Sequence, residues 1–124
     1  MTGATLDAGA LIAYERRPRA LELAIGRALR EGEIAIPAGV LAQVFRDGAR
    51  QARLMRLLDL EATEVVPLDG VAAQLVGRIC AVTGARDVID ASVVLCARLR
   101  RHVVLTNDAR DLLRIDPGLR VVEV

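Results

Sequence analysis

The chain has 124 residues, of which 53% are hydrophobic, and a formal net charge of +1. This length allows one well-covered core and is too short for two, so we expect a single domain over residues 1–124. No apolar run approaches the roughly 18–20 residues that span a bilayer, and the amino-terminal segment lacks the basic and apolar regions of a secretion signal. We therefore expect a soluble, cytoplasmic protein without a membrane partner.

The residue types exclude several classes of site. All basic residues are arginines, so there is no P-loop lysine, Schiff-base lysine or lysine of a phospho-receiver site. One Phe, one Tyr and no Trp argue against base-stacking platforms of the RRM or OB type. Cys80 and Cys96 lie in apolar helical patterns and are expected to be reduced core residues, and His102 is the single histidine, which argues against zinc sites. Carboxylates are therefore the expected catalytic groups.

Short β-rich runs alternate with longer helical runs along the chain. The pattern predicts strands at residues 4–7, 33–37, 62–68, 102–106 and 119–124. It predicts helices at residues 8–15, 19–32, 38–48, 49–60, 70–84, 88–100 and 108–115. Such alternation with apolar strands indicates an α/β protein, a three-layer α/β/α domain with a mostly parallel central sheet.

Two of the predicted helices have informative apolar patterns. The helix at 19–32 places apolar residues at helical spacing and ends at a glycine; these residues are Leu21, Ala24, Ile25, Ala28 and Leu29. The helix at 88–100 is apolar almost all the way round until its final arginines. A helix of that kind is covered on more than one side, so part of it is expected to face a second subunit.

Acidic residues mark the ends of predicted strands. Asp7 ends the first strand, Asp87 and Asp90 open the helix before the fourth strand, and Asp108 follows that strand. The carboxyl ends of parallel strands meet at one edge, so we expect these acids to lie together. Clustered carboxylates repel one another unless a cation offsets their charge, and oxygen-only ligands favour Mg²⁺ or Mn²⁺ over zinc. The pattern therefore predicts a site for Mg²⁺, with Mn²⁺ as an alternative, that activates water against a phosphate.

The same acids have a simpler interpretation as helix caps. Asp87 would cap its helix with Asp90 in the first turn, and Asn107 or Asp108, together with Asp111, would do the same for the next helix. Asp7 fits this interpretation less well, because an acid that closes a buried strand has no comparable structural role. We favour a metal site for the set because it converges from distant parts of the chain.

Four blocks of the sequence resemble those of the PIN domain, and especially of the VapC-type toxins of bacterial toxin–antitoxin pairs. In chain order these blocks are "TLDAGALIAYE", "IPAGVLAQVFRDG", "DVIDASVVLCARL" and "VVLTNDARDLL". The resemblance implies a Mg²⁺-dependent ribonuclease with an α/β/α fold. It also implies a homodimer that is held inactive by a small antitoxin docked beside or into the acidic pocket.

The resemblance assigns roles to individual residues. Asp7, Asp90 and Asp108 match the acidic catalytic positions of the family, which hold the metal. Asp87 matches a frequent additional acid one turn before Asp90, which makes it a fourth metal ligand. Thr106 matches the hydroxyl residue that usually supports the site. The expected metal cluster is therefore built from these four aspartates.

One block departs from the family pattern. Gln43 stands where many PIN domains carry a Glu, and an amide adds no charge, so we expect weaker ion binding. Gln43 is therefore assigned a supporting role, together with Asn107 in the fourth block. Glu15 is a conceivable substitute, but it lies about two helical turns from Asp7 and is more simply explained as a solvated helix-end acid.

Arginines suggest a path for RNA. If the helices of 38–60 run nearly straight, a stripe that binds phosphates leads away from the pocket, formed by Gln43, Arg46, Arg50 and Arg53. A solvated helix face explains each of these residues equally well, and a turn near Gly48 would break the stripe. Arg86 and Arg110 lie beside two of the acids and are expected either to pair with them or to bind a phosphate.

The leading hypothesis is an endoribonuclease that hydrolyses RNA phosphodiester bonds with a carboxylate-bound metal. Its antitoxin is expected on apolar surface near residues 19–32 and 38–60. The alternative, which Gln43 allows, is a catalytically weakened PIN-like module that binds RNA or a partner protein. A phosphatase or phospho-receiver is disfavoured, because Gly9 stands where the second acid of a DxD motif is expected.

Overall fold

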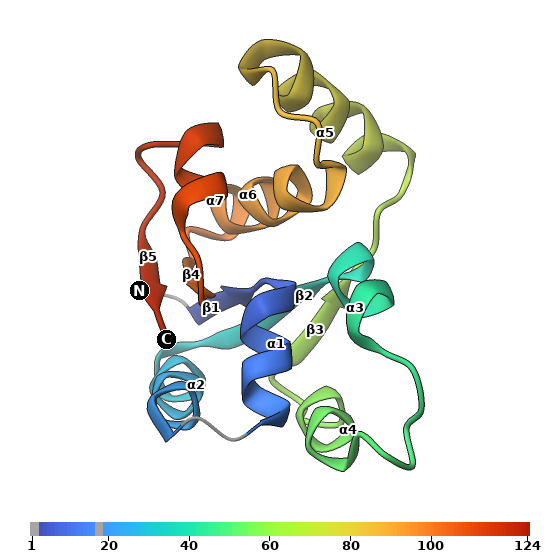
Figure 1. Ribbon diagram of the computed structural model, residues 1–124, viewed down its shortest axis with the longest axis vertical. Helices are drawn as coiled ribbons and strands as arrows, with labels where there is room; N and C mark the ends of the chain where they lie inside the picture. Colours follow the sequence, from blue (N-terminus) through green and yellow to red (C-terminus); the bar gives the residue numbers. More distant parts are fainter. Residues whose placement is uncertain (1–2, 17–18) are drawn as a thin grey trace.

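The computed structural model describes residues 3–16 and 19–124, and Figure 1 shows the arrangement of their helices and strands. The strands are β1 (Gly3–Leu6), β2 (Glu33–Pro37), β3 (Thr63–Val66), β4 (Val103–Thr106) and β5 (Val121–Glu123). The helices are α1 (Ala8–Glu15), α2 (Arg19–Glu31), α3 (Ala38–Val44), α4 (Ala52–Leu58), α5 (Gly70–Thr83), α6 (Val88–Arg100) and α7 (Arg110–Ile115). Each predicted strand and helix has a counterpart among these elements.

The strands form one parallel sheet in the order β3-β2-β1-β4-β5. In Figure 1, α5, α6 and α7 lie on one side of the sheet, and α1, α2 and α4 lie on the other. The predicted three-layer α/β/α architecture with a parallel sheet is therefore confirmed. None of the helices in residues 3–16 and 19–124 is long and apolar enough to cross a lipid bilayer.

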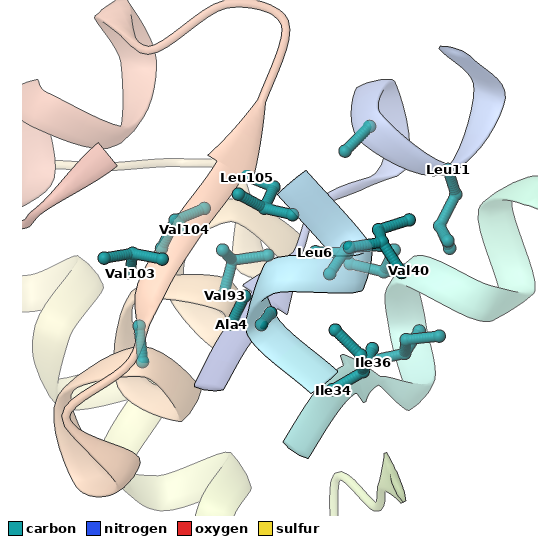
Figure 2. Close-up of a cluster of buried hydrophobic side chains, with 14 of the residues drawn as sticks. Ala4, Leu6, Leu11, Ile34, Ile36, Val40, Val93, Val103, Val104 and Leu105 are labelled. Atoms are coloured by element: carbon teal, nitrogen blue, oxygen red, sulfur yellow. The ribbon is translucent and has the colours of Figure 1, made fainter. Parts of the chain in front are cut away.

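The core lies between the central strands and the helices on both faces. All four residues of β1 and all four of β4 are buried, as expected for strands that helices cover on both sides. Figure 2 shows side chains from strands and helices meeting in this core, among them Leu6, Ile34, Val40, Val93 and Val104. Each fully buried aliphatic side chain of this kind stabilises the fold by about 1.5–3 kcal/mol.

The predicted apolar faces of the helices are buried. On α2, the buried side chains are Leu21, Ile25 and Ala28, on a helix that packs against β1 and β2. Helix α6 packs on β1, β2 and β4 and is covered in turn by α5 and α7, which explains its nearly continuous apolar sequence. Both cysteines are free thiols; Cys96 belongs to the core as predicted, whereas Cys80 on α5 is only half-buried.

The predicted pair of helices at 38–48 and 49–60 is shorter and interrupted. Helix α3 ends at Val44 and α4 begins at Ala52, with a loop over residues 45–51. The side chain of Gln51 fixes this loop: its Oε1 accepts hydrogen bonds from the backbone N–H groups of Arg46 (2.8 Å) and Asp47 (3.0 Å). Its Nε2 donates to the Val44 carbonyl at 2.9 Å. The two helices therefore do not run on as one straight helix, and the alternative of a turn near Gly48 that breaks the arginine stripe is confirmed.

The order of the strands positions the site. The chain adds β2 and β3 on one side of β1, and then crosses over to place β4 and β5 on the other side. In parallel sheets a crevice opens beyond the carboxyl ends of the two strands where the direction of winding reverses. Here those strands are β1 and β4, which pair in register with Leu6 opposite Leu105. Asp7, the residue after β1, and Thr106, the last residue of β4, therefore lie side by side.

A separate polar cluster lies inside the fold near the start of β4. The buried side chain of His102 has Nδ1 3.0 Å from Oγ1 of Thr5 and Nε2 3.7 Å from Oε1 of Glu33. The Thr5 hydroxyl also lies 3.6 Å from the Cys96 sulfur. Burial lowers the pKa of His102, with a smaller lowering by Arg100. The imidazole is therefore a neutral group of the core.

Candidate active site

Asp7 is held from two sides at the end of β1. Strand β1 ends at Leu6, so Asp7 is the N-cap of α1, and its Oδ1 accepts a hydrogen bond from the Ala10 N–H at 2.9 Å. Its Oδ2 accepts a hydrogen bond from Thr106 Oγ1 at 2.5 Å. The expectation that Asp7 has no structural role was thus wrong, because the residue after a strand is also the cap of the next helix.

Thr106 connects β1 with the loop after β4. Its side chain is fully buried, and its hydroxyl also accepts a hydrogen bond from the Asp108 N–H at 3.1 Å. The same loop is fixed from β5, where Oε1 of Glu123 accepts a hydrogen bond from the Ala109 N–H at 3.0 Å. These contacts hold the backbone of Asp108 close to the Asp7 carboxyl group.

The carboxylate of Asp108 is paired with Arg110. Arg110 donates from Nε to Oδ1 at 3.1 Å and from Nη2 to Oδ2 at 2.9 Å, which is a two-point contact. Because of this pairing the pKa of Asp108 is lowered to about 2, so the carboxylate stays ionised. Helix α7 begins at Arg110 rather than at the predicted residue 108, and Asp108 Oδ1 accepts a hydrogen bond from the first helical N–H.

Asp87 and Asp90 lie at the start of α6. Asp87 is the N-cap, and its Oδ1 accepts hydrogen bonds from the N–H groups of Ile89 (2.9 Å) and Asp90 (3.0 Å). The pKa of Asp90 is raised to about 6, mainly by burial and then, in decreasing order, by the negative charges of Asp87, Asp111 and Asp7. Asp90 is therefore the carboxyl group that the surrounding acids affect most.

The four predicted aspartates thus share one edge of the sheet, in agreement with the topology. The pKa of Asp7 is raised mainly by burial, and Asp108 contributes to the increase. Among the residues described, no three acidic, His or Cys side chains are placed as ligands around a single point. The chemistry of the donors fits a hard divalent cation, since all are carboxylates whose repulsion a cation would offset. The contacts of Asp108 with Arg110 would have to open for all four to bind it.

Asn107 packs against the first turn of α1. A Cβ atom placed on Gly9 would lie 2.2 Å from Oδ1 of Asn107, so only a glycine leaves room for this side chain. The glycine that argues against a phosphatase motif therefore has a steric role beside the candidate site. Gln43 is exposed on the last turn of α3.

The predicted arginine stripe does not form a straight path. Arg46 donates from Nη1 to the backbone carbonyls of Ala42 and Phe45, at 3.1 and 2.6 Å, so it is folded back onto the end of α3. Arg50 is an exposed loop residue whose Nε lies 3.8 Å from Oδ2 of Asp47. Arg53 pairs with Glu22 at 2.5 Å and lies over the Tyr14 ring.

Glu15 belongs to the same structural region. Its Oε1 accepts a hydrogen bond from Gln51 Nε2 at 2.9 Å, which ties the end of α1 to the loop before α4. It is therefore neither a substitute for the missing Glu nor a simply solvated acid. Its role is to support the loop over residues 45–51.

A cavity of about 360 Å³ opens next to Asp87 and Asp90. Arg86 lines it, as its position beside Asp87 suggested, and so do two residues to which the sequence analysis assigned no catalytic or binding role, Asp111 and Arg114. The signal for them was available, since α7 places Asp111 and Arg114 three residues apart on the helix that follows Asp108. The sequence does not show where α7 packs, however, and this spacing is also typical of any solvated helix.

Comparisons with known proteins agree with this arrangement. A family model of the PIN domain matches residues 4–116. A chain of VapBC2 from Rickettsia felis, solved bound to a DNA fragment from their promoter, aligns with a TM-score of 0.75 at 17% identity, over 98% of each chain. A chain of a toxin–antitoxin complex from Klebsiella pneumoniae aligns with a TM-score of 0.73 at 19% identity, over 98% of this chain and 100% of the other. FitAcB from Neisseria gonorrhoeae gives 0.65 at 17% identity, over 97% and 96% of the two chains.

No curated protein sequence matches the chain. At these low sequence identities, the structural alignments show a shared fold alone. The family model adds a sequence match that covers most of β1, all of β4 and all four candidate aspartates. The chain therefore belongs to the PIN domain family.

Proposed function

We propose that residues 1–124 form a single PIN domain that acts as a Mg²⁺-dependent endoribonuclease, the toxin of a type II toxin–antitoxin system in the cytoplasm. The observation that supports this most directly is that Asp7, Asp90 and Asp108 lie along one edge of the sheet, where its winding reverses, and that Asp7 feels the charge of Asp108 and Asp90 that of Asp7. Relatives of known structure include chains of toxin–antitoxin complexes. A hydrolase acting on RNA phosphodiesters is the activity that this acidic edge suits best.

In this proposal Asp7, Asp87, Asp90 and Asp108 are the metal ligands, and the first, third and fourth are catalytic. When bound, Mg²⁺ or Mn²⁺ would supply stabilisation of phosphate charge and a lowered pKa for an attacking water. Thr106 holds Asp7 in position through its hydrogen bond. Asn107 and Gln43 support the site from the β4 loop and from α3.

The arginines near the acids would bind the RNA backbone. Arg110 lies closest, because it already contacts Asp108; once a cation takes that carboxylate, its guanidinium can bind a phosphate. Arg86 lies beside Asp87 in the cavity. Arg46 and Arg50 are more distant loop residues, so their contribution would be general attraction rather than positioning.

The proposed antitoxin would bind apolar surface on the α2 side of the molecule. Leu23 on α2 is 69% exposed, and it lines a groove of about 490 Å³ together with Val103, Leu105 and Val122. An amphipathic helix buries its apolar face in grooves of this kind. Leu23→Glu should abolish capture of the co-expressed antitoxin while leaving RNA cleavage intact.

The proposed homodimer would use the outer face of α5 and α6. Val82 is 81% exposed and lines a groove of about 310 Å³ together with Leu75 and Leu95. Leu99, also on α6, is 66% exposed. Adjacent exposed apolar side chains of this kind mark interaction surfaces. Val82→Glu should convert a dimer to a monomer in light scattering, whereas a wild-type monomer would refute the dimer.

The decisive experiment is cleavage of structured RNA with and without Mg²⁺, compared with Asp7→Asn and Asp90→Asn. Asp69→Asn is a matched control, because Asp69 caps α5 through an Oδ1 contact to the Ala72 N–H at 2.9 Å, the same geometry as Asp7 on α1. We expect cleavage by the wild type and by the Asp69 variant, and none by the other two. Equal cleavage by all four proteins would eliminate the proposal.

A second candidate is a PIN-like module that binds RNA or a partner without efficient catalysis. The amide of Gln43 and the absence of a ready three-ligand group among the described residues favour it. It predicts that EDTA does not change the affinity for RNA, and that crystals of the protein soaked in Mn²⁺ contain no bound ion. In that case Gln43→Glu should raise Mn²⁺ affinity by adding a charged oxygen ligand.

A further inference from the structure

The cavity beside Asp87 and Asp90 has walls from three separate elements. Its lining comes from the end of α5 and the loop after it, from Asp87 and Asp90 at the start of α6, and from α7. Its volume of about 360 Å³ is at the lower end of the range of about 300–1,000 Å³ for small-molecule pockets. It therefore has room for about one nucleotide unit.

The loop wall has a fixed shape. Gly84 ends α5 in the left-handed conformation, with φ of 78°, which disfavours any residue with a side chain. Thr83 Oγ1 donates to the Ile79 carbonyl at 2.7 Å and accepts from the Ala85 N–H at 3.2 Å. The wall next to the acids is therefore backbone and small side chains, against which a flat base can lie.

Two arginines flank this cavity. Arg86 immediately precedes Asp87 in the sequence and lines the cavity. Arg114 on α7 also lines it; its side chain is 79% exposed, and its Nη1 lies 3.3 Å from Oδ1 of Asp111. An exposed pair three residues apart on a helix is weak, so Arg114 can exchange a carboxylate for a phosphate at little cost. With one Tyr and one Phe in the chain, neither of which lines the cavity, guanidinium planes are the available stacking surfaces.

We propose that this cavity is the subsite for the nucleotide adjacent to the cleaved bond of a single-stranded RNA, with Arg114 and Arg86 binding its phosphate. The inference rests on the proposed ribonuclease function and adds a substrate-positioning role for Arg114 and the α5–α6 loop. A phosphate bound there would place the next phosphodiester at Asp90, which lines the same cavity. The acids would thus act at the reacting phosphodiester, and the two arginines would bind the neighbouring phosphate.

The test compares Arg114→Ala and Arg86→Ala with Arg27→Ala, which removes an equally exposed arginine from an ion pair on α2, far from α7 in sequence. Cleavage of a short single-stranded RNA is followed as KM and kcat, and binding of the same RNA is titrated in EDTA at several salt concentrations. We expect each cavity variant to raise KM about 10-fold with kcat nearly unchanged, and to reduce the salt slope of binding by about 0.7. The Arg27 variant should match the wild type.

The outcomes separate this inference from the proposed function. Cleavage by the wild type with KM and salt slope unchanged in both cavity variants overturns the subsite and leaves the nuclease standing. A wild type that does not cleave overturns the nuclease, and the binding titration then decides: weaker binding in the cavity variants alone supports an RNA subsite, and equal binding in all variants refutes it. Arg114→Lys should restore part of the affinity, because it returns the charge without the planar two-point contact.

Discussion

Thr106 and Asp7 are joined by a hydrogen bond of 2.5 Å between side chains 99 residues apart in sequence. The bond crosses the reversal point of the sheet, from the end of β4 to the residue after β1. Since Thr106 also accepts from the Asp108 N–H, one buried hydroxyl sets the relative positions of two candidate ligands. Local helix capping alone would not require this contact.

Thr106→Val tests that relationship. The substitution keeps the volume and removes the donor, so Asp7 loses one of its two fixed contacts. We expect kcat for RNA cleavage to fall about 10- to 100-fold, as for other groups that orient metal ligands. The free energy of unfolding should fall by only about 1 kcal/mol. Thr106→Ser, which keeps the hydroxyl, should retain most activity, and a fully active Val variant would contradict the positioning role.

The raised pKa of Asp90, about 6, predicts an unusual pH dependence in metal-free protein. Between about pH 4 and 6 the folded state holds a proton that the unfolded state has released. The contribution of Asp90 to stability is therefore present at pH 4 and lost as the pH rises through 6. Asp90→Asn removes this loss and should exceed the wild type in stability at pH 7 by on the order of 1 kcal/mol.

Addition of Mn²⁺ should reverse that order. The ion offsets the repulsion that raises the Asp90 pKa, so at pH 7.5 it should raise the melting temperature of the wild type and leave Asp90→Asn nearly unchanged. At pH 5.5 protons compete, and the shift in the wild type should shrink. Thermal melts with and without Mn²⁺ measure both effects; equal shifts in the two proteins would count against Asp90 as a ligand.

Gly9→Ala tests whether the position of Asn107 matters. The added Cβ would meet Asn107 Oδ1, the end of a side chain that can move, so the protein should fold with a melting temperature close to the wild type. Helix propensity even favours alanine, by up to about 1 kcal/mol. RNA cleavage should nevertheless fall, because the displaced amide no longer supports the β4 loop.

Gly77→Ala is the matched control, a helical glycine on α5 whose added Cβ meets no atom within 4 Å. It should be fully active. A combined Gly9→Ala, Asn107→Ala variant should lose no more activity than Asn107→Ala alone if the glycine acts through Asn107. Additive losses would show that Gly9 affects the site by another route.

The sequence was sufficient for the sheet and for the edge at which the acids meet. Alternating apolar runs predicted the strands, and parallel topology then placed Asp7 and Asp108 together, because that inference needs only where strands end. Domain boundaries, ligand roles and the dimer remain predictions. Local capping was predicted only in part: the alternative interpretation of Asp87 as the N-cap of α6 is confirmed, whereas the same role of Asp7 on α1 was missed.

The remaining features depend on contacts between distant residues. The loop over 45–51 is set by Gln51, whose amide reaches both Val44 and Glu15 on α1, and no local pattern encodes that second contact. The importance of Asp111 and Arg114 depends on where α7 packs relative to α6. The pairing of Arg110 with Asp108 is one of the two roles that its position suggested, but spacing alone does not decide between them, nor whether acids that share an edge also converge on one point.

His102 provides a pH test of the core that is independent of the acids. Its pKa is lowered mainly by burial, with Arg100 lowering it further and Glu33 and Glu64 opposing the effect. Below pH 6.5 the unfolded chain therefore binds a proton that the folded chain does not, and stability should fall as the pH decreases from 7 to 5. This slope has the opposite sign to that of Asp90, so it is measured most clearly in the Asp90→Asn protein. In that background, His102→Asn should remove most of the slope in urea unfolding between pH 5 and 7, and an undiminished slope would show that His102 is not the group responsible.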